Sequence, residues 1–372
     1  MLNARQKKFC SIATIAVFLV VIGGLFILNF FTKPPPMLIS ERRVPAGMSE
    51  LSVGAVVSGD FMDGFEDFAA DSFPLRESFR TIRAATIFGP FFQTDKDGVY
   101  FDSHGIGSFQ SVNVSSVEQV ADKIRVVADS LDNMNIFYSI IPDKSIYSDR
   151  RMPGFDFELV EQLMRDRLPD EFIFIPLVDA LNAESFYRTD LHWNQIRIDG
   201  VLETLNIYMG IEIDLSQYRQ KYAGAFSGVY VGQLALPVES ESLYILDNPY
   251  LSALYLNMGT REFEIGPVYD MERFLGLDPY DIFLRGAQPI IILENENPTS
   301  DRQLYLFRDS FSSSLAPLLA SAYSRVTLID LRFVDLHTLG QLIDFTPGSD
   351  VLFLYSSVVL NSSDILLVPL TS

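Results

Sequence analysis

Residues 189–193 carry the side chains of a tuned general base. They read Thr189-Asp190-Leu191-His192-Trp193 and contain one of only three histidines in the 372-residue chain. A carboxylate two residues away can orient the imidazole, and the indole that follows can exclude water from the pair. A half-buried, hydrogen-bonded histidine beside a tryptophan would explain the same pattern without chemistry.

A candidate nucleophile, Ser310, lies far downstream. The apolar run 304–307 predicts a short buried strand, and the apolar spacing over residues 315–322 predicts a helix. Ser310 would then lie at a strand-to-helix turn, where free N–H groups of the first helical turn could stabilise an oxyanion. Asp309 and Ser310 are also favourable N-cap residues, so an ordinary helix cap is the alternative.

Several segments, taken in chain order, resemble the DHHW family of bacterial cell-surface proteins. That family is similar to the alginate O-acetyltransferases and to the wider SGNH (GDSL) hydrolase group. The resemblance extends over most of the chain after the first sixty residues, and its matching segments are 65–79, 98–100, 141–147, 189–193, 309–311 and 329–333. Segment 141–147 matches a proline-lysine motif at the end of a strand.

The resemblance implies a role for each residue of a catalytic triad. Ser310 would be the nucleophile, His192 its base, and Asp190 the group that orients the imidazole. The chemistry agrees, because a serine hydroxyl is a poor nucleophile until an adjacent base takes its proton. Three further residues are expected to support the triad: Asp309, Trp193 and Lys144.

The sequence departs from the family pattern in three places. Leu191 replaces the first histidine of the family name, which leaves the orienting pair intact. Arg308 precedes Asp309 where many serine blocks have glycine, so the backbone is expected to approach a substrate less closely. A Gly-x-Asn-Asp block is not recognisable, which leaves the side-chain oxyanion donor unidentified.

Apolar segments predict the fold class as α/β, with a mainly parallel sheet flanked by helices, as in SGNH hydrolases. Helices are predicted over 117–131, 158–168 and 196–205, the first of them with a capping box at 116–119. Strands are predicted over 136–141, 172–175, 289–293, 326–329 and 351–355. In such sheets sites collect at the carboxyl ends of strands, where Lys144 and Ser310 are expected.

Residues 210–285 predict an insertion of β character within this domain. Short alternations occur at 226–236 and 259–265, and aromatic residues are frequent. Tyrosine and phenylalanine rings could shape a saccharide groove, because they present flat apolar faces. Filling a small core of the insertion itself is the alternative.

The N-terminus predicts a membrane anchor. Residues 9–31 contain no charged side chain and are long enough to cross a hydrocarbon core as a helix. The basic residues of segment 1–8 place that tail in the cytoplasm and the main domain outside. Residues 32–60, with prolines at 34–36, would form an extracytoplasmic linker before the α/β domain at 61–372. A cleaved signal peptide is the alternative.

Composition excludes several classes of function. The net charge of −20 disfavours nucleic acid and anionic lipid partners. Cys10 is the single cysteine, so no disulfide forms within one chain. Metal-binding and nucleotide-binding patterns are missing, so no cofactor is expected. His104 is expected in a surface turn, and His337 repeats the Asp-x-His spacing without the tryptophan.

The sequence therefore predicts a serine-dependent acyl transfer outside the membrane. O-acetylation of a cell-envelope or exported polysaccharide is the leading function, with an acyl donor and a polysaccharide acceptor as partners. The resemblance implies a membrane-bound O-acyltransferase as a further partner. A carbohydrate O-acetyl esterase is one alternative, and an inactive envelope binding or assembly protein is another.

Overall fold

The computed structural model describes residues 4–32, 34–149 and 155–370, and the chain divides into two compact units. The first unit is Met1–Gln93 and the second is Thr94–Ser372. The domain start predicted from the sequence, residue 61, lies within the first unit. Each unit is described by itself below.

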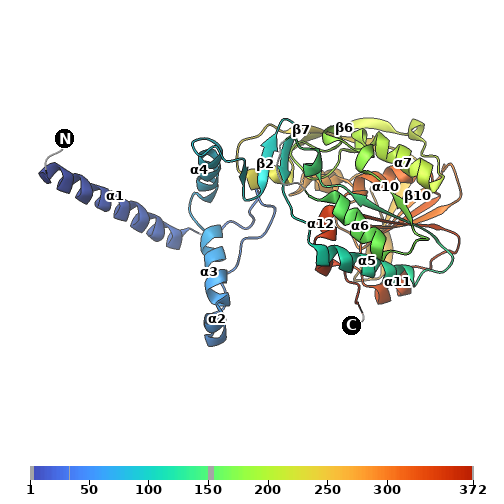
Figure 1. Ribbon diagram of the computed structural model, residues 1–372, viewed down its shortest axis with the longest axis horizontal. Helices are drawn as coiled ribbons and strands as arrows, with labels where there is room; N and C mark the ends of the chain where they lie inside the picture. The colour runs from blue at the N-terminus through green and yellow to red at the C-terminus, as the bar shows by residue number, and fades with distance from the viewer. Residues whose placement is uncertain (1–3, 33, 150–154, 371–372) are drawn as a thin grey trace. The chain divides into compact units, whose positions relative to one another are not determined.

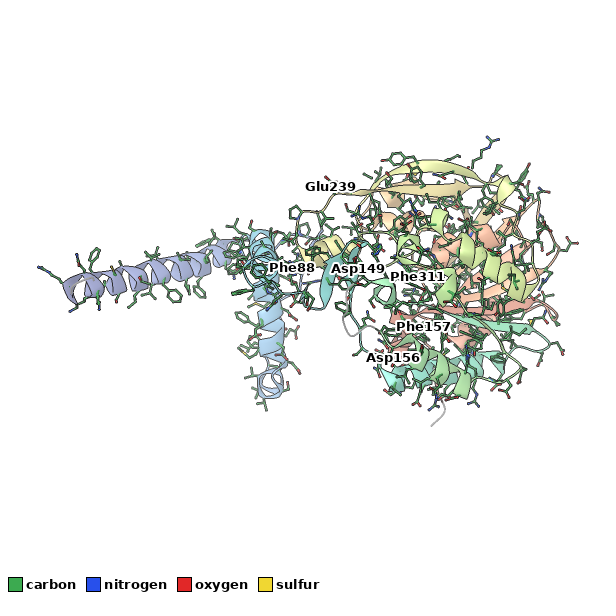
Figure 2. The ribbon with its side chains drawn as sticks, turned by 45° about the horizontal axis from the view of Figure 1, so that its top comes forward. Phe88, Asp149, Asp156, Phe157, Glu239 and Phe311 are labelled. Atoms are coloured by element: carbon green, nitrogen blue, oxygen red, sulfur yellow. The ribbon has the colours of Figure 1, made fainter. Side chains whose placement is uncertain are left out.

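The first unit is helical. Its elements are α1 (Ala4–Phe31), α2 (Val53–Ser58), α3 (Asp60–Asp71) and α4 (Arg76–Phe88). Within α1, the segment Arg5–Asn29 contains an 18-residue stretch with a mean hydropathy of 2.7 and is long enough to cross a membrane. None of the residues in this stretch is buried, and Figure 2 shows side chains along the length of α1. By its length and composition, this helix is a candidate membrane span.

A cluster of ion pairs around the buried Asp71 holds the segment before α2 against the ends of α3 and α4. The guanidinium of Arg43 donates to both carboxylate oxygens of Asp71, at 2.6 and 2.7 Å. Arg76 donates to Glu41 at 2.7 Å. The bond to Arg43 outweighs the effect of burial and lowers the pKa of Asp71. Part of the predicted linker 32–60 is therefore ordered by charge.

The second unit is built on an eight-stranded sheet with the order β5-β4-β13-β11-β12-β10-β8-β9. The first five strands in this order run parallel to one another, and each of the last three pairs antiparallel with the strand before it. The strands are β4 (Asn135–Ile141), β5 (Ile173–Ile175), β8 (Leu251–Asn257), β9 (Glu262–Gly266), β10 (Ile290–Asn295), β11 (Gln303–Arg308), β12 (Arg325–Ile329) and β13 (Asp350–Ser356). The mixed α/β fold predicted from the sequence is confirmed.

Helices cover both faces of this sheet, as Figure 1 shows. They are α5 (Val114–Ala128), α6 (Phe157–Arg167), α11 (Leu336–Leu342) and α12 (Ser357–Leu360) on one face, and α7 (Asp199–Met209) and α10 (Ser312–Leu319) on the other. Strand β11 is buried on both sides: Leu304 and Leu306 face α7 and α10, and Tyr305 and Phe307 face α5 and α6. The sequence of such a strand is a continuous apolar run because both of its faces are covered.

Two helix starts differ from the predictions. Helix α5 begins at Val114, because the Asn113 side chain accepts from the backbone N–H of Ser116. The predicted capping box at 116–119 is therefore wrong, since these residues already lie inside the helix. Helix α7 begins at Asp199, after a 3₁₀ turn at Gln195–Arg197, rather than at residue 196.

The segment 210–285 is only partly a separate insertion. Strands β6 (Arg219–Phe226) and β7 (Glu241–Asp247) form a hairpin of their own, whereas β8 and β9 extend the central sheet. The β interpretation of 226–236 is wrong, because Val229–Leu234 forms helix α8. The alternation at 259–265 is confirmed as part of β9.

Most buried aromatic residues of this segment fill a small core. That core contains Phe226, Phe274, Tyr280 and Phe283, packed with Leu243 and Ile282. These four rings therefore fill a core of the segment itself, which was the alternative to a saccharide groove.

The remaining helix and strands of the unit are the sheet β1 (Asp95–Lys96), β2 (Val99–Asp102) and β3 (Gly105–Ser108), and helix α9 (Met271–Phe274).

Candidate active site

Ser310 lies at the end of β11, in the turn that leads into α10. The carboxylate of Asp309 holds this turn, because Oδ1 accepts from the Phe311 N–H at 3.0 Å and Oδ2 from the Ser356 N–H at 2.7 Å. The second bond ties the turn to the end of β13, the strand beside β11. Asp309 is buried, and Ser310 is partly exposed.

The helix-cap alternative for this turn is not what the structure contains. Helix α10 begins at Ser312, and its N-cap is Phe311, whose side chain makes no capping bond. The Ser310 hydroxyl lies instead 2.8 Å from Nε2 of His192. Asp309 acts within the turn, and Ser310 is presented outward from it.

A short antiparallel bridge presents the histidine. Phe186 pairs with Trp193, and the Tyr187 N–H donates to the His192 carbonyl at 3.0 Å. The chain therefore reverses direction between residues 187 and 192, which places Asp190 in the reversal. The Asp190 Oδ1 atom accepts from the His192 backbone N–H at 3.0 Å. It also lies 2.6 Å from Nδ1 of the same histidine.

The structure thus brings the three predicted catalytic residues together. Asp190 can accept the Nδ1 proton of His192, which leaves the lone pair of Nε2 directed at the Ser310 hydroxyl. Burial would raise the pKa of Asp190, but the charge of His192 and three hydrogen bonds outweigh it and hold that pKa well below its usual range. One of these bonds comes from the Val229 N–H at 2.8 Å. Asp190 is therefore an ionised, fully paired carboxylate.

Aromatic side chains fix the imidazole on both sides. The ring of Tyr280 stacks on His192 with centroids 3.8 Å apart and planes 7° apart. Phe311 contacts the imidazole at 4.8 Å between centroids. The indole N–H of Trp193 donates to the Phe311 carbonyl at 2.9 Å and to the Ser314 hydroxyl at 3.0 Å. Trp193 thus joins the histidine segment to the serine helix.

Tyr280 is a site residue that sequence reasoning missed. Its hydroxyl donates to the Ser314 hydroxyl at 2.9 Å, so the ring is held at both ends. It comes from the segment 210–285, whose chain returns to the site through a 3₁₀ turn at Pro279–Ile282. No pattern in the sequence marks one aromatic residue of this segment above the others.

Lys144 holds the histidine segment through hydrogen bonds to its backbone carbonyls. Its buried ammonium donates to the carbonyls of Ile106 at 2.7 Å and Tyr187 at 2.6 Å, and more weakly to Arg188 at 3.3 Å and Asp190 at 3.4 Å. Burial lowers the pKa of Lys144 to about 8, although the negative charges of Asp190 and Glu241 oppose this. The ammonium therefore fixes the backbone that carries the orienting carboxylate.

Glu241 and Gly228 hold the same segment and were not predicted. The Glu241 carboxylate accepts from the backbone N–H groups of Arg188 and Thr189 and from the Thr189 hydroxyl, at 2.9, 2.8 and 2.6 Å. A Cβ at Gly228 would lie 2.4 Å from the Cβ of Asp190, so only glycine allows this approach. The glycine at position 228 is the one feature of the sequence that could have indicated this close contact.

The expected row of free N–H groups at the serine helix is largely occupied. The Phe311 N–H donates to Asp309 Oδ1, the Ser312 N–H to the Asp309 carbonyl, and the Ser313 N–H to the Ser310 carbonyl. Arg308 also differs from expectation. Its side chain is fully buried beneath the turn, so it does not stand between the backbone and a substrate.

The other two histidines lie apart from the triad. His104 is half-buried at a cavity of about 510 Å³ that is also lined by Arg188, Asn194 and Glu241. Neither Ser310 nor His192 lines this cavity. His337 is exposed on α11 and contacts Gln341. Within the described ranges, no group of three or more histidine, cysteine or acidic residues is arranged to hold a metal ion.

Solved structures resemble this fold. A DHHW family protein from Eubacterium siraeum aligns with a TM-score of 0.59 and 16% identity, covering 73% of this chain and 94% of that one. Bacillus cereus PatB1, solved with a sulfonyl adduct, aligns with a TM-score of 0.56 and 16% identity, covering 72% and 97%. The O-acetyltransferase domain of Pseudomonas putida AlgJ aligns at 0.43 and 11%, covering 71% and 92%.

No protein-family model matches the sequence, and no curated protein matches it either. The chain shares the α/β fold of the DHHW family protein and PatB1, in agreement with the fold class predicted from the sequence. At 16% identity this likeness concerns the fold.

Proposed function

We propose that the protein catalyses serine-dependent O-acyl transfer outside the membrane, with O-acetylation of a cell-envelope or exported polysaccharide as its reaction. The observation that carries the proposal is the continuous hydrogen-bonded series from Asp190 through His192 to Ser310, with distances of 2.6 and 2.8 Å. Nucleophile, base and orienting group are in direct contact, which is the arrangement that activates a serine hydroxyl.

The first half-reaction forms an acyl-enzyme. Ser310 Oγ bonds to the acyl carbon, the carbonyl electron pair moves to oxygen, and the hydroxyl proton passes to Nε2 of His192. Collapse of the tetrahedral intermediate restores the carbonyl and breaks the bond to the leaving alkoxide, which takes the proton from His192. Asp190 remains ionised and stabilises the imidazolium, consistent with its lowered pKa.

The second half-reaction decides between transferase and esterase. A sugar hydroxyl that gives its proton to His192 and attacks the acyl-serine yields an acylated saccharide, whereas water yields a free acid. The resemblance of segments 189–193 and 309–311 to the DHHW family, which is similar to the alginate O-acetyltransferases, favours the transferase. An esterase reaction is the alternative that uses the same residues.

The proposal places the main domain outside the membrane. Basic residues Arg5, Lys7 and Lys8 precede the apolar part of α1, and such flanks remain in the cytoplasm. An acetyl donor would then have to cross the membrane. We propose a membrane-bound O-acyltransferase as the protein that supplies it.

The test uses the full-length chain in detergent with p-nitrophenyl acetate as donor. Peptide mapping should find the acetyl group on Ser310, and adding a polysaccharide fragment should divert acetyl from water to sugar. Release to water alone, at a rate unchanged by sugars, would favour the esterase. A folded protein that forms no acetyl-serine would contradict both reactions and favour the inactive binding protein.

A further inference from the structure

A fully buried arginine lies directly beneath the nucleophile turn. Arg308 is the last residue of β11, and its exposed fraction is 0%. Burying a guanidinium is costly unless its charge is used or paired. The proposed mechanism above gives this residue no role, and ordinary packing would be served by an apolar side chain.

The hydrogen bonds of Arg308 go to neutral groups. One terminal nitrogen donates to the Asp309 carbonyl at 3.2 Å and to the Ser313 hydroxyl at 3.0 Å, and the other contacts the Gly286 carbonyl at 3.4 Å. Its Nε has no hydrogen-bond partner among the described residues. The charge is therefore directed at the turn itself.

Neighbouring carboxylates are engaged elsewhere. Asp330 is paired with Arg332 through bonds of 2.8 and 2.6 Å. Both oxygens of Asp309 accept backbone N–H groups, from Phe311 and Ser356. Asp330 and Asp309 attract the Arg308 guanidinium through space, but its hydrogen bonds go to none of their carboxylate oxygens. One of its acceptors is the Asp309 carbonyl, which belongs to the peptide group beside the nucleophile.

That peptide group joins Asp309 to Ser310. Its bond is trans, so the Ser310 N–H points away from the Asp309 carbonyl. The carbonyl accepts from Arg308 and from the Ser312 N–H, on the buried side of the turn. The Ser310 N–H therefore points to the opposite side, where Ser310 is partly exposed. The three following N–H groups already have acceptors, so this one is the backbone donor best placed for an oxyanion.

We propose that Arg308 is a positioning residue that orients and polarises the Asp309–Ser310 peptide group, which makes the Ser310 N–H the backbone donor to the oxyanion. A charged donor at the carbonyl end of a peptide strengthens the hydrogen bond made by its N–H end. This inference rests on the proposed acyl transfer. It assigns a source of oxyanion stabilisation to a chain in which an Asn block is not recognisable.

The experiment compares Arg308→Met, Arg308→Lys and Arg308→Gln with wild type in acylation by p-nitrophenyl acetate. Arg308→Met should lower kcat by about tenfold to a hundredfold and leave KM nearly unchanged, because the oxyanion exists only in the transition state. Arg308→Lys keeps the charge and should retain more activity than Arg308→Gln, which keeps a donor only. Arg302→Met, at the residue that precedes the other end of β11, is the control and should leave kcat unchanged.

The outcomes separate this inference from the proposed function. Wild-type acetylation of Ser310 tests the proposed function, and the variants are compared only with that rate. If Arg308→Met does not fold, the order of Arg308→Lys and Arg308→Gln decides. The inference is overturned if folded variants keep kcat within about twofold of wild type, or if Arg308→Gln is at least as active as Arg308→Lys.

Discussion

Two regions of the molecule have the same Asp-x-His spacing and use it differently. At 190–192 the carboxylate lies 2.6 Å from the imidazole, and both groups are buried. At 335–337 the carboxylate of Asp335 accepts from the Thr338 N–H and hydroxyl, at 2.9 and 2.8 Å, and His337 is exposed. In the first pair the carboxylate contacts the imidazole, and in the second it caps the start of a helix.

The surroundings account for the difference. Asp335 precedes a helix, where free N–H groups attract a capping side chain. Asp190 lies in a chain reversal fixed by Lys144, Glu241 and the Val229 N–H. Spacing alone therefore cannot make a catalytic pair, because the backbone conformation decides which donors the carboxylate meets.

The largest expected effect comes from removing the imidazole of His192, with removal of the His337 imidazole as the matched control. His192→Ala should lower acylation by about 10⁶-fold, since Ser310 then has no base. His337→Ala should leave the rate unchanged, because that ring is exposed on α11. Burst kinetics with p-nitrophenyl acetate measure both. Equal effects of the two substitutions would remove the distinction between the regions.

The orienting carboxylate should come next. Asp190→Asn should lower kcat by about 10⁴-fold, because the amide favours the wrong tautomer of His192. The matched change Asp335→Asn should leave kcat unaltered. Circular dichroism of both variants is the control for folding. A fully active Asp190→Asn protein would mean that the short contact to His192 has no catalytic value.

Two buried lysines sharpen the comparison further. Lys144 donates to carbonyls around the Asp190 segment, whereas Lys123 donates to the carbonyls of Ser363 and Leu366. Both Lys144→Met and Lys123→Met should lower the melting temperature. Only Lys144→Met should also lower kcat, by about tenfold or more, through the loss of a fixed geometry. Parallel losses of kcat in both would indicate a general effect on stability.

The smallest expected effect concerns pH. The pKa of Lys144 is lowered to about 8 in the folded protein, so between pH 8 and about 10.5 the unfolded chain binds more protons at this residue. Stability should therefore rise with pH in this window in wild type relative to Lys144→Met. Urea unfolding at pH 7.5 and 9.5 measures the difference. A wild-type curve that falls relative to the variant would contradict the lowered pKa.

The sequence predicted the parts of this site that local patterns encode. The strand ending at Arg308, the serine turn and the helix after it all follow from apolar periodicity. The pairing of Ser310 with His192 came from resemblance and from the logic of the chemistry. The local elements and the two motifs could be predicted from the sequence because each depends on a short segment of the chain.

The remainder depends on contacts between distant segments. The stacking of Tyr280 on His192 and the antiparallel addition of β8 to β10 join residues that no short window relates. The burial of Arg308 could not be predicted from the sequence, because arginine residues are mostly exposed in proteins. Such features require the tertiary structure.

The most direct test of the central claim is labelling of the full-length chain with a fluorophosphonate, followed by intact-mass analysis and peptide mapping. We expect a single adduct on Ser310 that is abolished in Ser310→Ala, slowed strongly in His192→Ala and retained in His337→Ala. A folded wild-type protein that takes no label, or that is labelled at the same rate without His192, would contradict an activated serine at this site.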